Sequence, residues 1–208
     1  MLHIILGTHN AKKLRELRML IPQDSLQLSS LADLEQQSIN VLEVEETGET
    51  FQENARLKAV QQAQHLGQWV LGEDSGLSVT ALDGRPGVYS ARYSGVEGEG
   101  RDHANNTLLL EELQDVPMEK RNAFYTSQLC LADPQGNVVL EATGRCHGRI
   151  AMQRVGQGGF GYDPLFIVDE YHKTFGEMGD AVKSAISHRS RALYAFLPQL
   201  LQLAQKQK

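Results

Sequence analysis

The first 21 residues show the pattern of a buried strand that passes directly into an amphipathic helix. Residues 2–6 form a short apolar run, which is typical of a strand inside a sheet. Leu14, Leu17 and Ile21 then recur at helical spacing, so that they share one face. This stretch therefore predicts a strand, a short turn and a helix.

A longer helix is predicted over residues 51–66. Thr50 and Glu53 have the spacing of a capping box, in which each side chain accepts a hydrogen bond from the other residue's backbone. Gly67 follows the last apolar position and is a typical helix end. The apolar stripe of this helix consists of Phe51, Ala55, Ala59, Ala63 and Leu66.

Residues 69–79 are predicted to form two short apolar strands with an acidic kink between them. Residues 69–71 and 77–79 are of the strand type, and the carboxylates of Glu73 and Asp74 lie between them. Two carboxylates at the end of an apolar strand are suited to metal binding or to general-base catalysis. An ordinary polar turn is an equal alternative on this stretch alone.

The second half of the chain predicts a hairpin and further helices. Residues 123–132 and 138–147 are strand-like, and the turn between them has proline at its second position and glycine at its fourth. Helices are expected over residues 105–114 and from Ser187 onward. Together these elements predict an α/β fold with a mixed parallel/antiparallel sheet and flanking helices, in a single domain over residues 1–208.

Charge and composition argue against nucleic acid and membranes as partners of this protein. The 208 residues include 20 Lys and Arg against 26 Asp and Glu, and the net charge of −6 argues against a broad nucleic-acid or membrane surface. No apolar run approaches the roughly 20 residues that span a bilayer, and the first residues lack a signal-peptide pattern. The two cysteines, Cys130 and Cys146, lack metal-ligand spacing. We expect a cytoplasmic protein without a membrane or nucleic-acid partner.

The turn before the first predicted helix is a candidate phosphate site. Thr8, Asn10 and Lys13 place a hydroxyl, an amide and an ammonium at a helix N-terminus, where backbone N–H groups and the helix dipole favour phosphate. Together they could hold a triphosphate. The alternative is simple capping of the helix by Thr8 or Asn10. The turn is not a Walker A loop, because Gly-x4-Gly-Lys-Ser/Thr is absent.

Four glutamates precede the helix over residues 51–66, namely Glu43, Glu45, Glu46 and Glu49. Acidic residues near a helix N-terminus compensate its dipole, which is one interpretation of the cluster. The other is that Glu45 joins Asp74 around a divalent cation.

A glycine-rich segment and the start of the last helix are candidates for binding a nucleoside. Residues 156–161 have the Gly-x-Gly-x-x-Gly spacing, but a dinucleotide site needs a strand before this motif and a helix after it, whereas here an apolar strand over residues 165–168 follows. Phe160 and Tyr162 are suited to stacking on a base. His188 and Arg189 lie near the start of a helix, where positive charge is unfavourable, which indicates an anionic or electron-rich group nearby. A solvated basic turn is the alternative.

Six stretches, in this order, carry a resemblance to a known family. They are Thr-His-Asn-Ala-Lys-Lys at 8–13, Glu-Thr-Gly-Glu-Thr-Phe-Gln-Glu-Asn-Ala at 46–55, Glu-Asp-Ser-Gly-Leu at 73–77, Pro-Gly-Val-Tyr-Ser-Ala-Arg-Tyr at 86–93, Gly-Gly-Phe-Gly-Tyr-Asp-Pro at 158–164 and Lys-Ser-Ala-Ile-Ser-His-Arg at 183–189. The chain closely resembles the inosine/xanthosine triphosphate pyrophosphatases, which hydrolyse non-standard purine nucleoside triphosphates. The resemblance extends from the first strand into the last helix.

The resemblance implies a fold with two lobes around a nucleotide cleft, a requirement for Mg²⁺ and a homodimer. It implies that Asp74 is the catalytic proton acceptor, and that Glu45 and Asp74 bind the metal. Residues 8–13, Lys58 and Ser75 would hold the triphosphate. The full set of implied substrate-binding residues is Thr8, His9, Asn10, Ala11, Lys12, Lys13, Lys58, Ser75, Phe160, Gly161, Tyr162, Asp163, Lys183, His188 and Arg189.

We therefore expect a nucleoside triphosphate pyrophosphatase that converts ITP, dITP and XTP into the monophosphate and pyrophosphate, and so keeps them out of DNA and RNA. Donors from Lys183, His188 or Arg189 would pair with a 6-oxo ring edge and reject a 6-amino edge. Two alternatives are a nucleotide-binding sensor without turnover and a pyrophosphatase for other modified nucleotides.

Overall fold

The computed structural model describes residues 2–21 and 26–206. Its strands are β1 (Leu2–Leu6), β2 (Leu26–Ser30), β3 (Trp69–Val79), β4 (Asn122–Ala132), β5 (Val138–Ile150), β6 (Phe166–Val168) and β7 (Lys173–Thr174). Its α-helices are α1 (Ala11–Leu20), α2 (Leu31–Gln36), α3 (Phe51–Leu66), α4 (Arg101–Glu112), α5 (Asp180–Ile186) and α6 (His188–Lys206).

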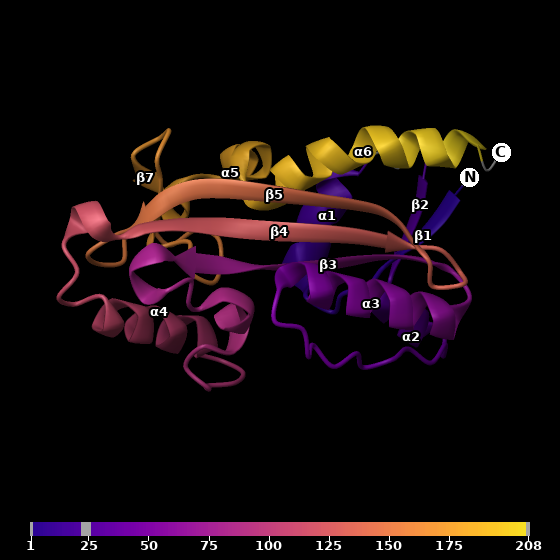
Figure 1. Cartoon of the computed structure of the whole chain (residues 1–208), viewed down its shortest axis with the longest axis horizontal. Coiled ribbons are helices and arrows are strands. Elements are labelled where there is room, and N and C mark those ends of the chain that lie inside the picture. Colours follow the sequence, from indigo (N-terminus) through magenta and orange to yellow (C-terminus); the bar gives the residue numbers. More distant parts are fainter. Residues whose placement is uncertain (1, 22–25, 207–208) are drawn as a thin grey trace. The chain divides into compact units, whose positions relative to one another are not determined.

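The strands form one sheet in the order β2-β1-β3-β4-β5-β6-β7 (Figure 1). β1 pairs in parallel with both β2 and β3, whereas β6 pairs antiparallel with β5 and β7. β4 and β5 are joined by the expected tight turn, in which the Asp133 N–H donates to the Asn137 carbonyl at 3.0 Å. The predicted mixed α/β fold is therefore confirmed.

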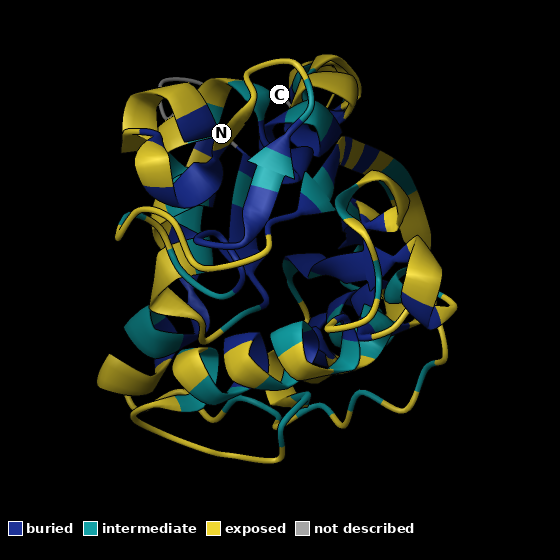
Figure 2. Ribbon diagram, turned by 90° about the vertical axis from the view of Figure 1, so that its left-hand side faces the viewer, coloured by how far each residue is buried: buried dark blue, intermediate teal, exposed yellow. Residues whose placement is uncertain are grey.

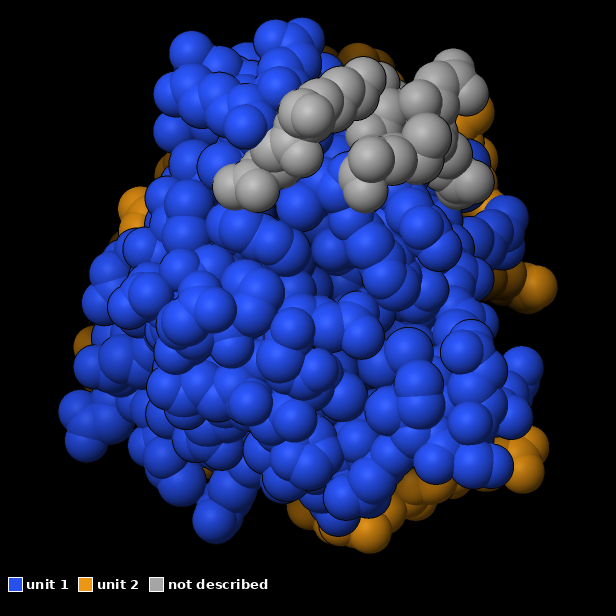
Figure 3. Space-filling model, turned by 90° about the vertical axis from the view of Figure 1, so that its right-hand side faces the viewer, with its two compact units in different colours: residues 1–74, 127–144, 189–208 blue, residues 75–126, 145–188 orange. Residues whose placement is uncertain are grey.

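The chain divides into two compact units, and Figure 3 colours their residues separately. Unit 1 comprises residues 1–74, 127–144 and 189–208, and unit 2 comprises residues 75–126 and 145–188. The single domain over residues 1–208 and the nucleotide cleft stay predictions.

In unit 1, strand alternation sends side chains to two different cores. On β1, Ile4 and Leu6 belong to a core with residues of α1 and α6, whereas Ile5 packs in a core with α2 and α3 residues. Side chains of a strand point alternately to its two faces, which explains the split. Figure 1 shows α3 and α6 on opposite sides of the sheet, and in Figure 2 the strands are largely buried while the outer helix faces are exposed.

Unit 2 has its own core, built from an aromatic cluster and from α4. Tyr125 contacts Phe166, with ring centroids 4.8 Å apart, and Phe166 stacks on Phe175 at 5.5 Å. Leu109 of α4 and Leu113 are fully buried in the same core. The unit therefore combines edge strands of the sheet with one face of α4.

Two predicted elements differ from the observed ones. Residues 69–79 form one continuous strand, so both the kink and the polar turn are wrong: pairing within the sheet holds the backbone extended through Glu73 and Asp74. Helix α4 begins at Arg101, four residues before the predicted start. The prediction missed the first turn because its residues are polar and show no apolar periodicity. Across the described ranges, none of the helices has the length and hydropathy to cross a membrane.

Candidate functional site

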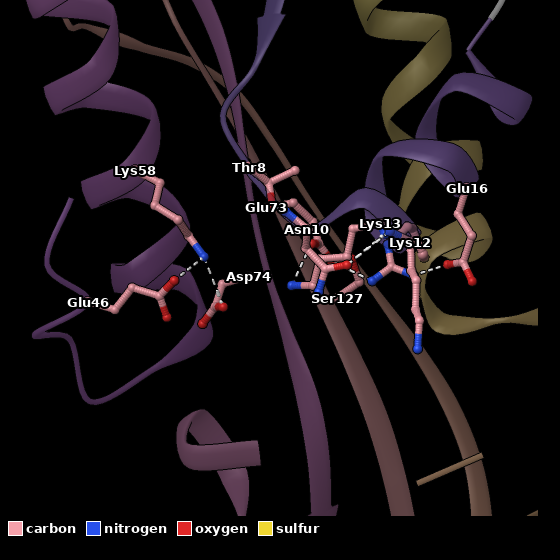
Figure 4. A network of polar contacts seen from close by, with 11 residues as sticks. Thr8, Asn10, Lys12, Lys13, Glu16, Glu46, Lys58, Glu73, Asp74 and Ser127 are labelled. Carbon is pink, nitrogen blue, oxygen red and sulfur yellow. Dashed lines mark hydrogen bonds and ion pairs between the residues drawn. The ribbon is translucent and has the colours of Figure 1, made fainter. Parts of the chain in front are cut away.

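The adjacent carboxylates of Glu73 and Asp74 point to opposite sides of β3 (Figure 4). Successive side chains of a strand alternate between faces, so neighbours in sequence have different surroundings. Asp74 meets α3 on one side, through Lys58, whereas Glu73 meets Lys13 of α1 and Arg189 of α6 on the other. The two carboxylates therefore belong to two separate polar groups of unit 1.

The first group centres on Asp74, which is 6% exposed. The Lys58 ammonium lies 3.0 Å from Asp74 Oδ1 and 2.9 Å from Glu46 Oε1. Asp74 Oδ2 is buried and has no hydrogen-bond partner among the described residues. Burial raises the pKa of Asp74 above its usual range, although the charges of Lys58 and Lys13 oppose this shift. A buried carboxylate with a raised pKa and one oxygen that accepts no hydrogen bond is suited to accepting a proton.

The acidic segment before α3 is held by hydrogen bonds from its backbone N–H groups to side chains of the helix. The predicted capping box is present: the Thr50 side chain accepts from the Glu53 N–H, and the Glu53 side chain accepts from the Thr50 N–H. Asn54 Oδ1 accepts from the Gly48 N–H at 2.8 Å. Glu45, the predicted metal ligand, is exposed, whereas the next residue, Glu46, reaches Lys58. The structure thus brings Glu46, and not Glu45, into the Asp74 group.

The second group centres on Glu73, whose side chain is fully buried. Its Oε1 accepts from Ser127 Oγ at 3.0 Å and from Arg189 Nη2 at 3.2 Å, while its Oε2 lies 2.8 Å from Lys13 Nζ. Arg189, which is 1% exposed, also pairs with Glu16 of α1. Burial alone would raise the pKa of Glu73, but the charges of Arg189 and Lys13 outweigh it and hold the pKa well below the ordinary value. Glu73 is therefore an ionised carboxylate inside a buried charge network.

The turn between β1 and α1 is arranged as a helix N-terminus. Asn10 is the N-cap, and its side chain accepts from the backbone N–H groups of Lys12 and Lys13. Thr8 Oγ1 accepts from the Asn10 N–H at 3.2 Å. The capping alternative is thus confirmed for Asn10, and the exposed His9 pairs with Glu35 of α2 at 3.2 Å. Ala11 and Lys12 are also exposed, so the outer side of this turn faces solvent.

In unit 2, the glycine-rich segment forms a third group around Asp163. Asp163 Oδ2 accepts from Lys183 Nζ at 2.7 Å and from the Phe160 N–H at 2.7 Å. The same Lys183 ammonium lies 4.2 Å from the centre of the Phe160 ring. Lys183 and Asp163 are 5% and 2% exposed, whereas Phe160 is half-buried. Aromatic rings are stacking surfaces for flat bases, so this half-buried ring, with the ammonium over one of its faces, is a candidate for binding a base.

Three further residues of unit 2 were predicted to bind substrate, namely Ser75, Tyr162 and His188. The Tyr162 hydroxyl donates to the Ser90 carbonyl at 2.9 Å. His188 stacks on Tyr125, with centroids 4.7 Å apart and planes at 11°. Ser75, the next residue of β3 after Asp74, is half-buried. Tyr162 and His188 therefore have structural contacts of their own, independent of any substrate.

The donor set of unit 1 fits Mg²⁺. Within residues 2–21 and 26–206, no three His, Cys, Asp or Glu side chains cluster as a ready-made metal cage. Mg²⁺ does not require one, because it typically takes one or two carboxylates and completes its shell with water and substrate phosphates. Asp74 Oδ2, which has no hydrogen-bond partner among the described residues, and the Glu46 carboxylate, which contacts the same Lys58, are hard oxygen donors of that kind.

Comparison with known proteins places the chain in a family. The profile of the Ham1 family matches residues 4–199. This chain belongs to the Ham1 family. It is 58% identical over 205 residues to a dITP/XTP pyrophosphatase of Rhodopirellula baltica, covering 99% of this chain and 96% of the relative. The predicted resemblance is therefore confirmed.

Solved structures agree with this assignment to the Ham1 family. A HAM1 protein from Coxiella burnetii matches with a TM-score of 0.84 and 34% identity, over 99% of this chain and 100% of that one. A nucleoside-triphosphatase, dITP/XTP pyrophosphatase, from Mycobacterium abscessus matches with a TM-score of 0.76 and 43% identity, over 95% and 100% of the two chains.

The structure also adds residues that the sequence analysis did not assign to the site. Glu46 has a signal in the acidic cluster, but choosing between neighbouring glutamates requires the fold. Ser127 and Glu16 contact Glu73 and Arg189 from distant segments and carry no motif. Arg189, predicted in the nucleoside pocket with Lys183 and His188, contacts carboxylates of unit 1, and its role toward substrate stays a prediction.

Proposed function

We propose that this Ham1 protein hydrolyses non-standard purine nucleoside triphosphates, such as ITP, dITP and XTP, to the monophosphate and pyrophosphate. The observation that carries the proposal is the environment of the buried Asp74. Its pKa is raised, its Oδ1 contacts the Lys58 ammonium, and its Oδ2 has no hydrogen-bond partner among the described residues. The names of the relatives, dITP/XTP pyrophosphatase, support the same chemistry.

In the proposed reaction, a water molecule attacks the α-phosphorus, the α–β anhydride bond breaks, and pyrophosphate leaves. Asp74 accepts the proton of the attacking water. Lys13, Lys58 and the positive end of the α1 dipole offset the charge of the phosphates. A bound Mg²⁺, held by Asp74 and by Glu45 or Glu46, would neutralise phosphate charge and orient the triphosphate.

The base is proposed to bind the residues of unit 2. Phe160 supplies a stacking surface, and Lys183 supplies a donor for a 6-oxo ring edge. Asp163 holds both by accepting from the Lys183 ammonium and from the Phe160 N–H. A 6-amino edge offers the Lys183 ammonium a donor in place of an acceptor, which disfavours adenine nucleotides.

The test is the release of pyrophosphate from a panel of triphosphates with and without Mg²⁺. We expect turnover of ITP, dITP and XTP, little turnover of ATP, and loss of turnover when EDTA removes the metal. Binding of dITP without release of pyrophosphate would instead support the alternative of a sensor. Preferred turnover of a modified pyrimidine nucleotide would support the other alternative.

The homodimer, expected from the resemblance, and the cytoplasmic location, expected from the sequence pattern, remain further proposals. Light scattering of the purified chain tests the dimer directly, because a monomer has half the mass.

A further inference from the structure

The segment that carries Phe160 is held by two residues of α4, both within unit 2. The Gly161 N–H donates to Asp102 Oδ2 at 2.9 Å, and Asn106 Nδ2 donates to the Gly161 carbonyl at 2.8 Å. Asp102 and Asn106 are four residues apart, so they lie on the same face of α4, whose place in the fold is labelled in Figure 1. Both backbone polar groups of Gly161 are therefore bonded to one helix.

The backbone of Gly161 has an unusual conformation, which these two hydrogen bonds help to hold. Its φ is +60°, in the left-handed region that residues other than glycine rarely adopt, and a Cβ at this position would have no neighbouring atom within 4 Å. The two hydrogen bonds to Asp102 and Asn106 hold the backbone in this conformation. Phe160 directly precedes this residue, and its own N–H donates to Asp163. The orientation of the Phe160 ring depends on this short run of backbone.

The Asn106 amide is fixed by its partners. Asn106 is 1% exposed, and its Nδ2 donates to two carbonyls, those of Gly161 and Asp102. Its Oδ1 is buried and has no hydrogen-bond partner among the described residues. The opposite orientation of the amide would place its oxygen against two carbonyl oxygens, which cannot donate. The geometry therefore makes Asn106 a donor toward Gly161.

We propose that Asp102 and Asn106 are positioning residues that fix the Phe160 ring for stacking against the base. The inference rests on the proposed function and adds two residues to it. Both side chains bond the residue that directly follows Phe160. We therefore expect their effect on recognition of the base, and the experiment below asks whether phosphate binding changes as well.

This assignment predicts a selective loss of affinity. Stacking of a base on an aromatic side chain contributes a factor of about 5 to 150 in affinity. A Phe160 ring that is no longer held keeps only part of this factor, and we expect KM for dITP to rise about tenfold. The turnover number changes little, because Asp74 and the phosphate ligands are unaffected.

The experiment measures kcat and KM for dITP, together with the inhibition constant of inorganic tripolyphosphate, which lacks a base. The variants are Asn106→Ala and Asp102→Ala. Asp102→Asn keeps an acceptor oxygen for the Gly161 N–H and should recover most of the affinity that Asp102→Ala loses. Thr107→Ala, on the exposed side of α4, is the matched control and should leave KM unchanged.

The expected result is a higher KM for dITP in both alanine variants with an unchanged inhibition constant for tripolyphosphate. The inference is overturned if both constants change by the same factor, if KM is unchanged while the melting temperature falls, or if Asp102→Asn is as impaired as Asp102→Ala. If Asn106→Ala does not fold, the two Asp102 variants decide the outcome. Absence of dITP turnover in the parent would overturn the proposed function instead, so the two failures are distinguishable.

Discussion

Replacement of Arg189 by methionine tests the buried charge network of unit 1. The substitution keeps a long side chain but removes the guanidinium that pairs with Glu73 and Glu16. Glu73 is fully buried, and of the hydrogen-bond and ion-pair partners described for it Lys13 and Ser127 remain. Breaking a buried ion pair by removing one partner costs about 3–5 kcal/mol, because the remaining charge stays buried.

The loss is large compared with the total stability of a protein, which is about 5–15 kcal/mol. For a chain of this size, each kcal/mol lowers the melting temperature by about 2–4 °C, so we expect a decrease of about 6–20 °C. Urea unfolding at pH 7, followed by circular dichroism, measures the free energy of unfolding directly. The control is Arg56→Met, which removes a surface pair whose arginine is 47% exposed and should cost less than about 1 kcal/mol.

The difference between parent and variant should also depend on pH. In the parent, the pKa of Glu73 is lowered, so its stabilising contribution is present above the ordinary value of 4.5 and is lost as the pH falls through the folded-state pKa. The stability gap between parent and Arg189→Met should therefore be full at pH 7 and shrink below pH 4.5. If Arg189→Met is as stable as Arg56→Met at pH 7, the network does not stabilise the fold and the reasoning is refuted.

Three further predictions concern catalysis. Asp74→Asn should lower kcat for dITP by about 10²–10⁴-fold with the fold intact; a parent-like rate in the variant would exclude this mechanism. Lys13→Ala should weaken ITP, XTP and tripolyphosphate by one common factor, because the ammonium contacts no base; a loss confined to one base would remove Lys13 from the phosphate site. Glu46→Gln should raise the Mg²⁺ concentration needed for half-maximal rate more than Glu45→Gln does, and metal titration giving the reverse order would restore Glu45 as the ligand.

Local elements of this protein could be predicted from the sequence because local interactions determine them. The capping box of Thr50 and Glu53, the cap at Asn10 and the turn after β4 each depend on residues within a few positions of one another. The set of short motifs was also sufficient to recognise the family. Neither result required knowledge of which segments meet in space.

The surroundings of the acidic pair were decided only by the tertiary structure. Sheet pairing keeps β3 extended through Glu73 and Asp74, and the alternation of an extended strand then sends the two carboxylates to opposite faces. On those faces, segments far apart in the chain supply the partners: Arg189 is 116 residues from Glu73, and Ser127 is 54 residues away. No periodicity or motif encodes such contacts, because they arise from the packing of α1, α3 and α6 on the sheet. The same holds for Asn106 and Gly161, which are 55 residues apart.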